Sequence, residues 1–178
     1  RESGTFAWIV VIALGLMSAG TTGTYSIVAG SFVAPVCEDL GFGYASFSFY
    51  FTAILLGLAV GLPLLSRFIP RVIGKPWHIA VELILIAAGA AMAFYTEVWM
   101  FIASAAVIGV CFSFTTGVCM SDVIDQWFNR SSGLAIGLAW GVNSLCTLLL
   151  SPVITLVIEQ QGGRMGFIVL AVVSAILI

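Results

Sequence analysis

Two polar side chains within long apolar runs are the residues of this chain best placed to do chemistry. Glu82 is the one carboxylate clearly inside an apolar run, and Asn143 is an amide inside another. A carboxyl group removed from water favours its neutral form, so Glu82 is a candidate for proton coupling. It lies only about a turn and a half from the end of its run at Trp77, so a structural role there is the alternative.

The middle of the first apolar run is polar and reads G-T-T-G-T-Y-S from Gly20 to Ser26. Such residues predict either a contact between helices or the wall of a water-filled cavity, and the phenol of Tyr25, which needs a partner, favours the cavity. Hydroxyl groups can instead bond the backbone of their own helix. Asn143 can likewise bond a neighbouring helix, because an amide without a partner is costly in apolar surroundings.

No constellation typical of an enzyme occurs in the sequence. It has no glycine-rich phosphate loop, no metal-ligand spacing around His78 or the four cysteines, and no nucleophile with a His and an acid to meet it. We therefore expect no enzymatic activity, no metal and no cofactor. A net charge of -2 gives no reason to expect a nucleic-acid partner.

The elements that hold these residues are predicted to be membrane-spanning helices. The chain is 61% hydrophobic and 8% charged, whereas soluble domains carry about 25% charged residues. We predict an all-α membrane protein whose lipid-embedded bundle has six spans, at about 6–35, 45–65, 77–95, 98–120, 134–158 and 167–178. The last run is short for a span and the chain begins without Met, so we expect it to be part of a longer polypeptide.

Glycines four residues apart predict faces on which helices approach closely. One such pair is Gly57 and Gly61, and a longer series is Gly133, Gly137 and Gly141. The longer series follows charged and aromatic residues (D-Q-W-F-N-R, 125–130), an order typical of a membrane surface.

Basic residues predict the orientation of the spans. Counting alternate loops, one side holds Arg1, Arg67, Arg71, Lys75 and Arg130, and the other holds only Arg164. The positive-inside rule therefore places both termini in the cytoplasm of a multi-pass protein, which we expect in a cell inner membrane.

Three stretches together resemble the major facilitator superfamily of secondary transporters. The loop from Pro63 to Lys75 is similar to the family's basic loop signature. The stretch from Trp127 to Gly141 resembles the W-F-x-x-R-R-G-L-A-x-G-I-x-x-x-G pattern of the monocarboxylate and oxalate:formate antiporter branch. The pair Gly163 and Arg164 resembles the Gly-Trp-Arg turn before the sixth span. The resemblance covers the chain as an amino-terminal six-helix half.

The chain also departs from the family's patterns. Pro70 stands where the loop signature has its acid and Ser66 where it has its first glycine, so the family's lock between halves is in doubt here. Ser131 and Ser132 replace the basic pair, and the fourth span lacks the arginine that many drug and sugar porters carry.

The resemblance implies a secondary active transporter that moves a small organic solute, a monocarboxylate-like anion, by alternating access. The chain would need its carboxy-terminal half or a second copy of itself, and the anion's countercharge would come from there. In the family the first and fourth spans line the cavity and the fifth contributes, which at midplane depth selects Thr22, Tyr25, Ser26, Ser113, Thr116, Trp140, Asn143 and Ser144.

The resemblance also implies a cytoplasmic gate. Arg67 and Arg71 end the second span, and Asp122 and Asp125 end the fourth, so ion pairs between them would close that face.

A non-transporting six-span scaffold or receptor module is the alternative function. It predicts a dry interior in which Asn143 and the threonines of the first span all bond to protein.

Overall fold

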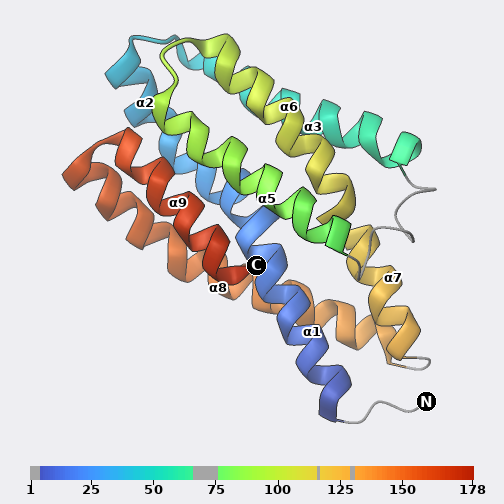
Figure 1. The fold of residues 1–178 in the computed structure, drawn as a ribbon. Helices are drawn as coiled ribbons and strands as arrows, with labels where there is room; N and C mark the ends of the chain where they lie inside the picture. Colours follow the sequence, from blue (N-terminus) through green and yellow to red (C-terminus); the bar gives the residue numbers. More distant parts are fainter. Residues whose placement is uncertain (1–4, 66–75, 116, 129–130) are drawn as a thin grey trace.

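The computed structural model of the chain describes residues 5–65, 76–115, 117–128 and 131–178, which form a bundle of helices (Figure 1). No strand occurs in these ranges. The first long element is irregular. It runs through α1 (Thr5–Ser18), the π-helix η1 (Ala19–Ile27), the 3-10 helix η2 (Val28–Phe32) and α2 (Val33–Leu40). The following elements are α3 (Tyr44–Leu65), α5 (Pro76–Ala91), η3 (Met92–Phe94), α6 (Val98–Thr115), α7 (Gly117–Trp127), α8 (Ser132–Gln161) and α9 (Gly163–Leu177).

Five helical stretches in the described ranges are long and apolar enough to cross a membrane. They are Phe6–Leu40, Tyr44–Leu64, Trp77–Phe94, Val98–Trp127 and Ser132–Gln161, and α9 is a shorter apolar helix. The helical content and these stretches are compatible with the predicted membrane helical bundle.

Two helical stretches extend further than their apolar runs predict. The first continues to Leu40 rather than ending near residue 35, and the fourth continues to Trp127 rather than to about residue 120. Hydropathy falls at the first carboxylates, such as Asp39 and Asp122, but these side chains are not buried and leave the helical backbone bonds intact. Gly41 then ends α2 in the left-handed conformation, with a φ of 69°.

The helices pack in a repeated pattern. α1 packs along α8, and α3 packs along α6 (Figure 1). α5 contacts α6, and in the corresponding pair α9 contacts η1. α5 and α9 also contact each other. Exchanging the first helical stretch, α3 and α5 with the α6–α7 stretch, α8 and α9 therefore reproduces most of these contacts. The exception is the packing of α8 on α9, for which α3 and α5 have no comparable contact.

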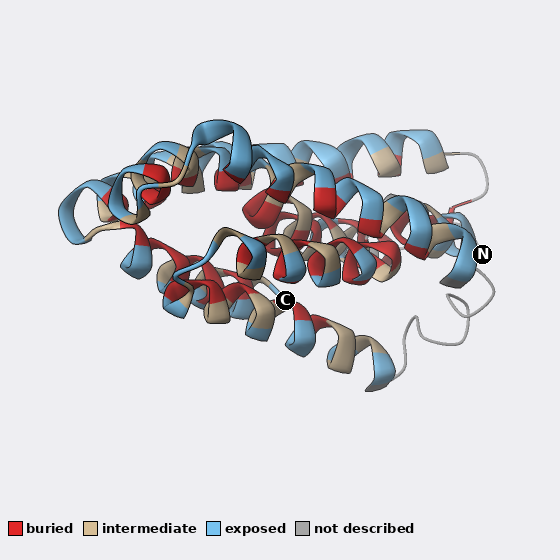
Figure 2. Cartoon of the chain, turned by 90° about the horizontal axis from the view of Figure 1, so that it is seen from above, coloured by how far each residue is buried: buried red, intermediate tan, exposed pale blue. Residues whose placement is uncertain are grey.

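Glycines allow the closest of these approaches. A Cβ on Gly15 of α1 would lie 2.7 Å from the Ala139 carbonyl oxygen of α8. A Cβ on Gly57 of α3 would lie 2.5 Å from the Ala106 carbonyl oxygen of α6. The buried faces of the helices point toward one another and the exposed faces outward (Figure 2). The outward faces are strongly apolar, as a lipid-facing surface requires.

Candidate functional site

The π-helical segment η1 lies at the middle of the Phe6–Leu40 stretch, where the sequence places its glycines and hydroxyls. The Thr21 hydroxyl donates to the Met17 carbonyl at 3.1 Å, and the Thr24 hydroxyl bonds backbone carbonyls of its own helix and lies 3.3 Å from the Ser174 hydroxyl of α9. The hydroxyls of Ser18 and Thr22 are buried without a hydrogen-bond partner among the described residues. The hydroxyl groups in and beside this segment are therefore only partly hydrogen-bonded within the described part of the chain.

Tyr25 belongs to the packed interior. Its side chain is 1% exposed, and its phenol stands where a side chain on Gly89 of α5 would otherwise be. The Tyr50 hydroxyl of α3 donates to the Tyr25 backbone carbonyl at 3.1 Å. The first, second and third spans thus meet around this residue.

Asn143 faces η1 from α8. The Thr147 hydroxyl donates to the Asn143 backbone carbonyl at 2.8 Å and lies 3.3 Å from its side-chain oxygen. Both side chains are buried and crowd Gly23, which has no room for a Cβ. Gly23 and Thr147 therefore belong to this polar contact, although their sequence positions alone gave no sign of it.

The remaining candidates for the cavity differ in burial. Ser113 of α6 is buried against Gly61, and its hydroxyl has no partner in the described part of the chain. Ser144 is exposed on α8, because successive helical residues turn by about 100° and Asn143 takes the inward direction. Trp140 is also exposed. Ser26 is half-buried, and Thr116 lies outside the described residues. The prediction that all eight share one hollow therefore stays a prediction.

Glu82 is buried rather than extended toward the end of its helix. It is 2% exposed, and neither carboxylate oxygen has a hydrogen-bond partner among the residues that the structure describes. The Nε2 atom of His78, one turn earlier on α5, lies 3.9 Å from Glu82 Oε1. Gly89, which receives the Tyr25 phenol, is two turns further along the same face of α5.

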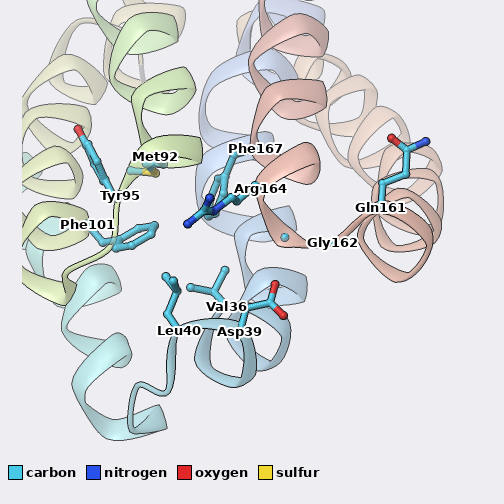
Figure 3. Close-up of a pocket in the computed structure, with 11 residues that line it drawn as sticks. Val36, Asp39, Leu40, Met92, Tyr95, Phe101, Gln161, Gly162, Arg164 and Phe167 are labelled. Carbon is cyan, nitrogen blue, oxygen red and sulfur yellow. The ribbon is translucent and has the colours of Figure 1, made fainter.

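Two pockets open at opposite ends of α6. The first, here the Arg164 pocket, has a volume of about 270 Å³. The Arg164 side chain extends into it toward Phe101, and the Asp39 carboxylate lies near Gly162 (Figure 3). Arg164 is the one Lys or Arg side chain in the described ranges. The remaining wall comes from Val36, Leu40, Met92, Tyr95, Gln161, Gly163 and Phe167.

The second, here the His78 pocket, has a volume of about 240 Å³. Its lining is mostly apolar, but His78 and Thr115 bring polar groups to it, and the Thr115 hydroxyl is buried without a partner in the described ranges. Neither pocket is lined by the eight residues predicted for the cavity. His78 and Thr115 were not among the predicted site residues; the signal available was the spacing of His78 and Glu82, four residues apart on one helix face.

The structure describes only the acidic residues of the predicted gate, and only one of the two predicted glycine faces lies against another described helix. Asp122 and Asp125 lie on α7 and are not buried, whereas Arg67 and Arg71 lie outside the described residues, so the gate stays a prediction. Gly57 and Gly61 lie against α6, as packing glycines do, but no described atom lies within 4 Å of a Cβ built on any of Gly133, Gly137 and Gly141. The longer glycine series therefore packs against no described helix of this chain, because it lies on the outward face of α8.

No protein-family model matches the chain, and no similar curated protein or solved structure was found for it.

Proposed function

We propose that this chain is one half of a secondary active transporter that moves a small organic solute by alternating access. The observation that carries the proposal is the repeated packing pattern, in which the first helical stretch, α3 and α5 correspond to the α6–α7 stretch, α8 and α9. Units of three spans related in this way have inverted topologies, because an odd number of crossings reverses the direction of the chain. Inverted repeats are the architecture from which many secondary transporters are built.

The irregular first span supports the same function. π-helical turns are uncommon and often occur at functional sites. Transporters place their solute sites near the bilayer midplane, where helices depart from regular geometry. Here η1 occupies the middle of the first span and leaves the hydroxyls of Ser18 and Thr22 without described partners. Buried polar groups of this kind are available to water or to a solute.

We propose that the solute is a small monocarboxylate-like anion, on the resemblance of the stretch from Trp127 to Gly141. The described spans have no Lys or Arg at their middle, and Arg164 lies in a pocket at one end. The countercharge would then come from a second six-helix half or a second copy of the chain. The outward face of α8 with Gly133, Gly137 and Gly141 offers a surface on which such a unit can pack closely.

The proposal includes a cell inner membrane as the location, with both termini in the cytoplasm, on the distribution of Lys and Arg between alternate loops.

A membrane scaffold remains the second candidate, because part of the interior is well bonded. Thr21 and Thr24 bond their own backbone, and Thr147 bonds Asn143. Tyr25 is almost completely buried. These contacts are what the scaffold predicts. Among the described residues, the unpartnered groups of Ser18, of η1 with the Tyr25 phenol, of α5 and of α6 depart from it.

Thiol labelling separates the two functions. Thr22→Cys is introduced into the full-length protein after the native cysteines have been replaced by serine, and a membrane-impermeant thiol reagent is applied to each side of sealed vesicles. Transport predicts labelling at position 22 whose sidedness changes when small monocarboxylates are added. Leu83→Cys, exposed on α5, is the lipid-facing control and should stay unlabelled, whereas Glu159→Cys at the end of α8 should label throughout. Protection of position 22 from both sides, with and without solute, would favour the scaffold.

A further inference from the structure

Glu82 is a buried acid whose carboxylate accepts no hydrogen bond in the described part of the chain. Both of its oxygens lack hydrogen-bond partners in the described ranges, and the residue lies within the Trp77–Phe94 span. An ionised carboxylate buried in this way costs several kcal/mol, whereas a protonated one has only unmet hydrogen bonds. None of the other carboxyl side chains that the structure describes is buried: Glu38, Asp39, Glu97, Asp122, Asp125 and Glu159. Among the described acids, Glu82 is therefore the one whose burial favours the protonated form.

His78 stands between Glu82 and the outside of the bundle. Its side chain is 18% exposed, compared with 2% for Glu82, and its Nε2 atom lies 3.9 Å from Glu82 Oε1. The ring also lines the His78 pocket, together with Phe114 of α6. Figure 1 shows the start of α5 beside the junction of α6 and α7, which form the rest of that pocket with α1. From the interior outward, the order is therefore the Glu82 carboxyl group, the His78 imidazole and the opening of the His78 pocket.

The neighbouring titratable groups supply no competing positive charge. Tyr25 of η1 and Cys111 of α6 lie within electrostatic reach of Glu82, and Cys119 of α7 lines the His78 pocket. Phenols and thiols are ordinarily uncharged at neutral pH, with pKa values of about 10 and 8.5. Arg164 belongs to the pocket at the opposite end of α6. In the described part of the chain, His78 is therefore the cationic group available to Glu82.

We propose that Glu82 is a proton-binding site loaded through the His78 pocket. The two atoms, 3.9 Å apart, first close to hydrogen-bond distance by side-chain rotation. The Nε2–H bond of the His78 imidazolium then breaks as the Oε1–H bond of Glu82 forms, leaving a neutral imidazole and a neutral acid. The imidazole then takes its next proton from hydronium in the pocket, and the reverse steps unload the site. Proton binding at Glu82 stands independently of transport, whereas its use as the coupling ion rests on the proposed function.

Infrared spectroscopy of the purified full chain in lipid nanodiscs tests the site directly. A protonated-acid carbonyl band at neutral pH reports a carboxyl group that keeps its proton, and the burial of Glu82 predicts that this group is Glu82. The band should disappear in Glu82→Gln and remain in Glu97→Gln, which removes an exposed carboxylate. A wild-type spectrum without the band at neutral pH would overturn the proposal without recourse to any variant. Survival of the band in Glu82→Gln would overturn it as well, because the proton would then lie on another acid.

Hydrogen–deuterium exchange at the same band tests the route. His78→Gln should keep the band but slow its exchange by about 100-fold, the lower end of what a positioned proton-transfer group contributes. His78→Gln with wild-type exchange would show that protons reach Glu82 by another path. Loss of solute uptake with an intact, exchanging band would refute only the proposed transport function, so the two failures are distinguishable.

Discussion

The contact between α3 and α6 depends on the absence of a side chain at position 57. A Cβ at Gly57 would lie 2.5 Å from the Ala106 carbonyl oxygen and 3.1 Å from both Gly109 Cα and Val110 N. These are backbone atoms of α6 and cannot rotate away, so Gly57→Ala must push the two helices apart. Gly137→Ala on α8 is the matched control, since no described atom lies within 4 Å of its Cβ position.

The expected magnitude follows from the difference between these two substitutions. Each replaces a glycine within a helix by alanine, which on its own favours the helix by about 1 kcal/mol. That gain cancels in the comparison and leaves the overpacking cost, about 1–3 kcal/mol. We expect the free energy of unfolding of Gly57→Ala to lie about 1–3 kcal/mol below that of Gly137→Ala.

Equilibrium unfolding of the chain in mixed micelles with increasing SDS, followed by circular dichroism, measures this difference. Equal free energies of unfolding within about 0.5 kcal/mol, the usual error of additivity, would refute the α3–α6 packing described here. So would a more stable Gly57→Ala variant.

Three further results are expected. The free energy of unfolding of Gly89→Ala should lie about 1–3 kcal/mol below that of Gly137→Ala, because the added methyl group displaces the Tyr25 phenol; equal values in the same titration would contradict that contact. A double-mutant cycle of Asn143→Ala and Thr147→Val should give a coupling energy of about 0.2–0.5 kcal/mol, as for polar side chains one turn apart on the same helix, and additive effects would mean that the side chains do not interact. Ser144→Ala, adjacent to Asn143 but exposed, should change the free energy of unfolding by no more than about 0.5 kcal/mol, and a larger loss would place Ser144 in a contact.

The sequence predicts where the helices are better than it predicts which face of each helix points into the bundle. Apolar runs predict the spans, because their length and composition are what a bilayer selects. The same four-residue glycine spacing occurs in α3 and α8, but only the α3 series lies against another described helix. Spacing shows that small residues share a face; it does not show whether that face points inward or outward.

The polar residues illustrate the same limit. Asn143 and Ser144 are neighbours in the sequence, but one is buried and the other exposed. Within η1, π-helical geometry breaks the 3.6-residue period on which facing arguments rest, so the contact of Tyr25 with Gly89 could not be predicted from spacing. The apolar run around Glu82 predicts that this residue is intramembrane, but its burial depends on which neighbours α5 meets.

Uptake of labelled small monocarboxylates by vesicles that carry the full-length protein tests the transport function most directly. The proposed function predicts saturable accumulation above that of empty vesicles, and the proton site predicts that a proton gradient changes its rate in wild type and in Glu97→Gln but not in Glu82→Gln. Uptake equal to that of empty vesicles for every monocarboxylate tested, with folded protein present in the membrane, would contradict the proposed function.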